Sequence, residues 1–152
     1  MKTLMQWLGI TSLTLLLTAP AVADGLLMAR TKNQFPEAMT LLQSAISSRG
    51  YTITRLQQVN ENLQKRHFAS DMYRVVYFGK YDEIKQVTAK HPELIPFLPL
   101  NITVFAEGNQ AILVASQPRM LEGIFTDPEM KPLFERWEKD TEAIIDEVRV
   151  AQ

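Results

Sequence analysis

The chain has 152 residues, contains no cysteine and carries a formal net charge of −1 at pH 7. The lack of cysteine excludes disulfides, a cysteine-linked lipid anchor, thiolate catalysis, and zinc or haem sites that use cysteine. A near-neutral chain without a basic run also lacks the electrostatic footprint of a nucleic-acid-binding protein, so we expect no nucleic-acid partner.

The first 23 residues have the three-part pattern of a cleavable signal peptide. Lys2 gives a positive start, residues 7–17 form an apolar stretch, and Pro20 precedes small residues that end at Ala23. The apolar stretch is about half of the roughly 20 residues that span a bilayer, so we expect no stable membrane anchor. Cleavage is predicted between Ala23 and Asp24, and the mature protein is predicted to be periplasmic.

The remaining residues, 24–152, are predicted to form one α+β domain. Its first half is expected to hold a strand over 26–31, a helix from about Phe35 to Gly50, and a strand over 51–57. A short helix, capped by Asn60 and ending near Phe68, completes this half. The long helix is assigned from apolar residues at helical spacing, and the strand over 51–57 from alternation of apolar and polar residues.

The second half is expected to be richer in strands. A strand over 74–78 and a helix over 81–90 lead into a proline-rich connection. Strands over 101–106 and 110–116 follow as a hairpin, and a last helix is expected from Asp127 to about Val148. Hairpins mixed with helices favour an antiparallel sheet over a doubly wound parallel one.

Three of the predicted strands are apolar on both of their faces. These segments are Leu26–Ala29, Val75–Phe78 and Ala111–Ala115. A sheet that is covered on only one face should instead alternate apolar and polar side chains. The second face is therefore expected to be covered by the long C-terminal helix, by a second subunit in a homodimer, or by an apolar ligand.

Several segments together resemble the domain of unknown function 302 family. They are the strand end Phe78-Gly79, the step Leu98-Pro99, the apolar strand Ile102 to Phe105, the hairpin Glu107-Gly108, and the strand Ile112 to Pro118. The resemblance covers roughly residues 25–120. It implies the topology strand, helix, four strands, helix of TATA-box-binding proteins, with a curved antiparallel sheet and helices packed mainly on one face. It does not imply DNA binding, because a fold does not carry a function.

The resemblance supplies a fold but no mechanism, since the family has no agreed activity. Some members carry cysteines at positions that correspond to Gly79 and Leu100, so a thiol role in those members cannot transfer to this chain. Other members have Asn-Pro where this chain has Lys80-Tyr81.

His67 is the first candidate for a functional side chain. Asp71 follows four residues later, and on one helical turn this spacing would let the carboxylate orient the imidazole. Met72 would add a soft ligand for copper, and Tyr77 is a further candidate for ligand binding. The only other histidine is His91, predicted at a helix end, so a multi-histidine site within one chain is excluded.

No motif for catalysis, metal binding or cofactor binding stands out, since both a Gly-x-Ser-x-Gly elbow and a Gly-rich phosphate loop are missing. We therefore expect a non-catalytic domain without cofactor that binds a small ligand or a periplasmic protein partner. The alternative is a metal-handling or enzymatic accessory protein that uses His67 with Asp71 or Met72. A buried His67 that faces a pocket beside Asp71 would favour the alternative, and an exposed His67 would favour the binding protein.

Overall fold

The structure is a computed structural model that describes residues 25–151. The predicted signal peptide and its cleavage site between Ala23 and Asp24 lie outside these residues. The elements are, in chain order, β1 Leu26–Thr31, α1 Phe35–Ser48, β2 Thr52–Gln58, α2 Val59–Gln64, β3 Tyr73–Gly79, α3 Tyr81–Lys90, the 3-10 helix η1 Pro92–Phe97, β4 Leu100–Glu107, β5 Gln110–Ser116, the 3-10 helix η2 Pro118–Gly123 and α4 Lys131–Val150. The predicted α+β class is confirmed.

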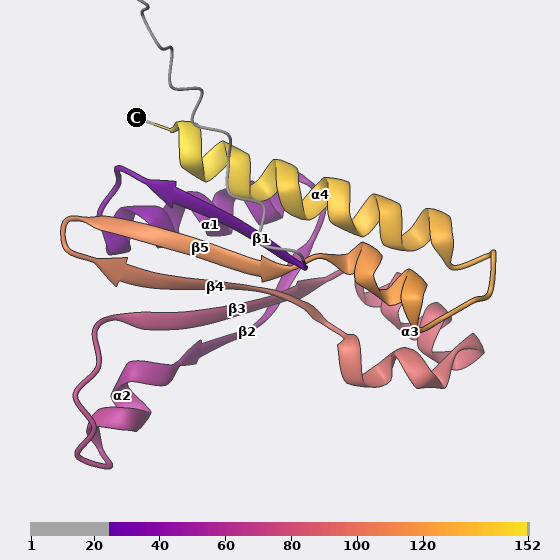
Figure 1. Ribbon diagram of the computed structural model, residues 1–152, viewed down its shortest axis with the longest axis horizontal. Helices are drawn as coiled ribbons and strands as arrows, with labels where there is room; N and C mark the ends of the chain where they lie inside the picture. Colours follow the sequence, from indigo (N-terminus) through magenta and orange to yellow (C-terminus); the bar gives the residue numbers. More distant parts are fainter. Residues whose placement is uncertain (1–24, 152) are drawn as a thin grey trace, which may run out of the picture.

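The five strands form one open antiparallel sheet in the order β1-β5-β4-β3-β2 (Figure 1). The first strand thus returns to pair with the last one, and each neighbouring pair is antiparallel. The predicted order of strand, helix, four strands and helix is confirmed, with α2, α3, η1 and η2 inserted between its elements.

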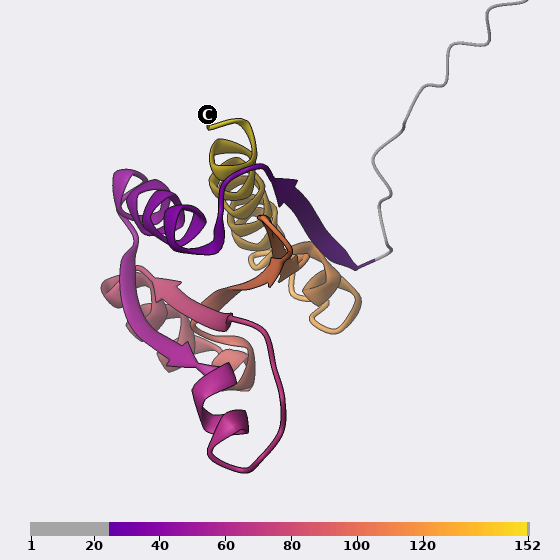
Figure 2. The same ribbon diagram turned by 90° about the vertical axis from the view of Figure 1, so that its left-hand side faces the viewer.

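Helices α1 and α4 lie on the same face of the sheet (Figure 2). Their apolar stripes pack against alternate residues of the strands and make the main core. Its fully buried members include Leu42 and Ile46 of α1, Ile144 and Val148 of α4, and Val76, Phe78, Ile102, Val104 and Leu113 of the sheet. The expectation that the helices pack mainly on one face is met by these two long helices.

A second apolar cluster lies where η1, η2 and the first half of α4 meet. It consists of Leu94, Leu121, Met130, Phe134 and Trp137. The proline-rich connection predicted before β4 is largely the single 3-10 helix η1. Within residues 25–151, no helix is both long enough and apolar enough to span a bilayer.

The predicted turns at Gly50 and Gly108 are confirmed. Gly50 has φ 72° and follows Arg49, the C-cap of α1, and Gly108 has φ 59° in the two-residue turn between Glu107 and Gln110. Both values lie in the left-handed region that glycine enters without a steric penalty. These two residues therefore end the first long helix and close the β4–β5 hairpin.

The starts of α2 and α4 differ from the prediction. The two side chains expected to cap these helices form hydrogen bonds elsewhere. Asn60 does not cap α2 but lies buried inside it, and its side-chain oxygen accepts a hydrogen bond from Arg74 of β3. Asp127 does not start α4. Its Oδ1 accepts the Glu129 N–H at 2.9 Å, which closes a turn, and the helix begins at Lys131.

Candidate functional site

The face of the sheet opposite α1 and α4, called here the open face, carries a row of apolar side chains. Neighbouring residues of a strand point to opposite faces, so the buried Val104 and Leu113 place Phe105 and Val114 on the open face. Tyr73 joins them from β3, directly opposite Phe105, and Met28 joins from β1, directly opposite Val114. Met28 is 57% exposed, which shows how little covers this face at its β1 end.

The C-terminal helix was one of three covers expected for the second face of the apolar strands, and this expectation is wrong. Ile144, Ile145 and Val148 of α4 belong to the same core as α1. The apolar stripe of α4 is therefore already used on the covered face. Neither of the two long helices, α1 and α4, therefore covers the open face (Figure 2).

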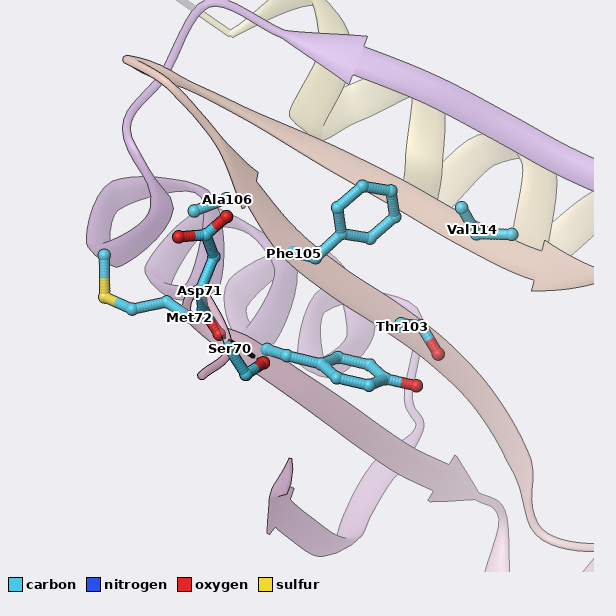
Figure 3. Close-up of a pocket in the computed structure, with 8 residues that line it drawn as sticks. Ser70, Asp71, Met72, Thr103, Phe105, Ala106 and Val114 are labelled. Carbon is cyan, nitrogen blue, oxygen red and sulfur yellow. Dashed lines mark hydrogen bonds between the residues drawn. The ribbon is translucent and has the colours of Figure 1, made fainter. Parts of the chain in front are cut away.

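A pocket with a volume of about 540 Å³ lies on the open face (Figure 3). It is lined by Ser70, Asp71, Met72, Tyr73, Thr103, Phe105, Ala106 and Val114. Figure 3 shows Asp71 and Met72 at one end beside Ala106, Phe105 in the middle, and Val114 at the other end. The pocket therefore runs across three neighbouring strands and ends at the segment that leads into β3.

The floor of this pocket is built from two cross-strand pairs. Tyr73 lies opposite Phe105, and Thr103 lies opposite Val114. Directly paired side chains in an antiparallel sheet have Cβ atoms about 5 Å apart, so the two aromatic rings share one surface. The floor is therefore mainly apolar, with the hydroxyl groups of Tyr73 and Thr103 as its polar points.

The segment Ser70 to Met72 forms the polar end of the pocket. The Ala106 N–H donates to the Met72 carbonyl at 2.9 Å, which attaches this segment to the end of β4. The Ser70 hydroxyl donates to the Asp71 carbonyl at 3.1 Å rather than to a base. The exposed Asp71 carboxylate makes no hydrogen bond or ion pair with residues 25–151, and it gives the pocket lining its one charge.

The structure brings together only part of the predicted site. Asp71 and Met72 line the pocket, whereas His67 is exposed and does not. The single helical turn expected for His67 and Asp71 is not formed. Helix α2 ends at Gln64, and His67 has a left-handed φ of 64° that turns the chain away from a helical path. The buried His67 facing a pocket beside Asp71, which the alternative required, is therefore not formed in the structure.

Tyr77 lies on the open face but outside the pocket. Its hydroxyl donates to Gln57 Oε1 at 3.4 Å, and the Arg55 guanidinium lies 5.9 Å from the centre of its ring. Tyr77 therefore extends the aromatic surface toward β2. Neither Phe105 nor Val114 was predicted as a site residue, although Val114 lies in a strand that is apolar on both faces and Phe105 in the neighbouring strand.

A cluster of polar side chains on the covered side has all its groups paired. The Tyr51 hydroxyl donates to Asp140 Oδ2 at 2.6 Å, and Trp137 Nε1–H donates to Glu83 Oε2 at 3.0 Å. Arg136 forms an ion pair with Glu83. Burial and then the hydrogen bond to Asp140 raise the pKa of Tyr51 well above its ordinary value. This cluster joins Tyr51, which lies directly before β2, to α3 and α4 and is a structural network.

His91 lies at the end of α3, as predicted. Its Nδ1 is 3.4 Å from Glu93 Oε1, and its Nε2 is 3.9 Å from Asp127 Oδ2. No group of three or more histidine, aspartate or glutamate side chains within residues 25–151 is placed to hold a metal ion.

Comparison with known proteins identifies related sequences and folds. The family model described as "Domain of unknown function DUF302" matches residues 28–148. The crystal structure of an uncharacterized conserved DUF302 protein from Bacillus stearothermophilus has a TM-score of 0.76 and 22% sequence identity to this chain. That match covers 84% of this chain and 100% of the other, and at this identity it shows a shared fold alone. A search of curated proteins found no match.

Proposed function

We propose that this chain, which belongs to the DUF302 family, is a non-catalytic protein that binds a small, mainly apolar ligand on the open face of its sheet. The observation that carries the proposal is the pocket of about 540 Å³ whose floor is the Tyr73–Phe105 pair. Pockets for small molecules have volumes of about 300–1,000 Å³ and mainly apolar walls with a few polar groups. The pocket on the open face matches this description in both size and lining.

The apolar floor would supply most of the binding energy. A ligand of aromatic size that buries about 200 Å² of apolar surface gains about 5 kcal/mol, before the loss of its translational freedom is counted. A complex driven by this burial alone is expected to have a dissociation constant in the millimolar range. Polar groups at the end of the pocket would then fix the orientation of the ligand.

Asp71 is expected to exclude anionic ligands from this pocket. Its carboxylate is the one charge in the lining, and an anionic ligand would meet it with like-charge repulsion. A neutral or cationic ligand avoids this repulsion. The preferred ligand is therefore an apolar molecule with a neutral or positive polar end.

A fluorescence titration with the neutral apolar probe N-phenyl-1-naphthylamine tests the proposal. The wild-type protein is expected to enhance the fluorescence saturably, and Phe105→Ser is expected to weaken binding about tenfold or more because it removes half of the aromatic floor. Phe68→Ser is the matched control, since Phe68 is 63% exposed and lies outside the pocket. Equal binding by both variants would contradict the proposal.

A homodimer or a periplasmic protein partner that covers the open face is the competing explanation for the apolar surface. Sedimentation equilibrium separates a second copy from a small ligand. A monomer at micromolar concentration is expected. A wild-type dimer that dissociates in Phe105→Ser but not in Phe68→Ser would show that a second copy, and not a small ligand, covers the open face.

We also propose that the protein is exported to the periplasm. The support is the basic start, the short apolar stretch and the small residues before Asp24. N-terminal sequencing of the protein from a periplasmic extract is expected to begin at Asp24. A protein that still begins at Met1 would contradict this proposal.

Metal handling by His67 with Asp71 or Met72 is tested by calorimetric titration with copper. The exposed position of His67 leads us to expect no saturable binding at micromolar metal. Saturable binding that is lost in both His67→Ala and Met72→Ala would establish the alternative function instead.

A further inference from the structure

The two edges of the sheet differ in how well they are protected from pairing with another strand. At one edge, β2 has an irregular register between Ile53 and Arg55 and leads directly into α2. At the other edge, β1 pairs with β5 over six consecutive residues from Leu26 to Thr31 without an irregularity. Bulges and charged side chains are the usual protection of an edge strand, and β1 has only Arg30 to serve this purpose.

At this edge, the backbone of β1 presents hydrogen-bonding groups that have no partner among residues 25–151. The Gln117 N–H donates to the Gly25 carbonyl at 3.0 Å, so these two residues form a hydrogen-bonded pair at the start of the ladder. Hydrogen-bonded and non-bonded pairs alternate along antiparallel strands. Leu26, Met28 and Arg30 therefore direct their N–H and C=O groups away from β5. Figure 2 shows β1 as the outermost strand on its side of the sheet.

A groove with a volume of about 610 Å³ lies between this edge and helix α4. Its lining comes from Leu27, Met28 and Ala29 of β1 and from Glu142, Ile145, Asp146 and Arg149 of α4. An added strand would lie about 4.8 Å from β1. Its side chains would point alternately to the open face and toward this groove.

The α4 wall of the groove is acidic. Glu138, Glu142 and Asp146 follow one another at a spacing of four residues, which places them on one side of the helix. The Asp146 carboxylate is paired with Arg149 at 2.9 Å, but Glu142 has no ion pair within residues 25–151. Burial, followed by the charges of Glu138 and Asp146, raises the pKa of Glu142, and Arg119 opposes this shift. A cation from outside the chain would therefore relieve a repulsion that already exists.

We propose that an extended segment of a partner protein adds to β1 as a sixth strand, with apolar side chains on the open face beside Met28 and a lysine or arginine toward Glu142. Hydrogen bonds to the free backbone groups would provide affinity, and the alternating side chains would provide specificity. This partner is recognised through a different surface from the pocket. Strand addition at β1 and ligand binding in the pocket can therefore be tested independently of each other.

A second copy of the chain fits this edge less well than a basic partner. If two copies of β1 paired antiparallel in one continuous sheet, the residues pointing toward the groove would be Leu27, Ala29 and Thr31 of the second copy, none of which is basic. Glu142 would remain uncompensated in both copies. Charge complementarity thus favours a different protein whose segment alternates apolar and basic residues.

Two blocked hexapeptides provide the test. One is acetyl-(Val-Lys)₃-amide and the other is acetyl-(Val-Glu)₃-amide, and each is titrated into the ¹⁵N-labelled full chain. The basic peptide is expected to shift the amides of Leu26, Met28 and Arg30 saturably and to slow their hydrogen exchange. Glu142→Lys is expected to weaken this binding about five- to tenfold and to favour the acidic peptide. Glu37→Lys, the same change at an exposed position of α1, should have no effect.

N-methylation of the basic peptide distinguishes strand addition from general electrostatic attraction. All valine N–H groups of an added strand point one way, and all lysine N–H groups point the other way. Methylation of one set is therefore expected to abolish binding, whereas methylation of the other set should be tolerated. Equal binding of both methylated peptides, equal binding of the acidic and basic peptides, or shifts outside β1 and α4 would overturn the proposal. Slow exchange at Met28 in the free protein together with a dimer in sedimentation would also overturn it, in favour of a second copy.

Discussion

The two faces of the sheet have similar apolar side chains but very different surroundings. Val104 and Leu113 face α1 and α4 and are fully buried, whereas their neighbours Phe105 and Val114 face outward and line a pocket. The apolar content of a strand therefore determines how much surface can be buried. The placement of the helices decides which face is buried within the chain and which one is left for a ligand or a partner.

The largest expected effect is a difference in stability when valine is replaced by alanine on each of the two faces of the sheet. Val104→Ala should lower the free energy of unfolding by about 2–3 kcal/mol, because it removes two methyl groups from a fully packed core. Val114→Ala should cost less than about 1 kcal/mol, since its side chain is only partly covered. Urea denaturation measures both values. Equal costs would show that the open face is covered in solution.

The second prediction concerns the polar network on the covered side. Tyr51→Phe should cost about 1.5–3 kcal/mol at pH 7, because Asp140 loses a hydrogen bond to its charged carboxylate. Tyr81→Phe is the control, since Tyr81 is 75% exposed and should change stability by less than about 0.5 kcal/mol. Urea denaturation at pH 7 compares the two variants. An unchanged free energy of unfolding in Tyr51→Phe would show that the network does not contribute to stability.

The same network predicts a pH dependence above neutrality. Because burial and Asp140 raise the pKa of Tyr51, the folded state keeps this proton at a pH where the unfolded chain releases it. The contribution of Tyr51 is complete below the ordinary tyrosine pKa of about 10 and is lost as the pH rises above it. The stability difference between wild type and Tyr51→Phe should therefore shrink above about pH 10. A constant difference up to pH 11 would contradict this interpretation.

The smallest expected effect is at the groove beside β1. Glu142→Gln should stabilise the fold by about 0.2–0.5 kcal/mol at pH 7, because it removes like-charge repulsion with Glu138 and Asp146. The raised pKa means that the charged carboxylate destabilises the fold, so the gain should disappear as Glu142 is protonated in acid. Glu147→Gln, which breaks the ion pair with Arg49, should instead lower stability slightly. A change in stability of the same sign in both variants would contradict the explanation by repulsion at Glu142.

Much of the fold is predictable from local signals in the sequence. The bounds of β1, α3 and β5 agree with the prediction because apolar patterns coincide there with turn residues such as Gly108. The ends of α2 and α4 do not follow from local signals. Asn60 is held by Arg74 from a distant strand, and Asp127 makes a turn with Glu129 where a cap was expected.

The pocket is less predictable than the fold because its residues come from three strands. Tyr73, Phe105 and Val114 become neighbours only through the register of β3, β4 and β5, which no single local motif of the sequence indicates. The sequence did show the cause of the pocket, namely strands with apolar residues on both faces. The helical turn expected for His67 and Asp71 does not form, because His67 has a left-handed φ. A left-handed φ at a non-glycine residue has no clear signal in the sequence.

Intermolecular nuclear Overhauser effects between the naphthylamine probe and the protein test the central claim most directly. If the open face binds an apolar ligand, the probe protons should show contacts to the Phe105 ring and to the Val114 methyl groups. Contacts to Val104 or Leu113 should be missing, since these side chains lie on the covered face. A probe that contacts neither Phe105 nor Val114, or that fails to bind the monomer at all, would contradict the account.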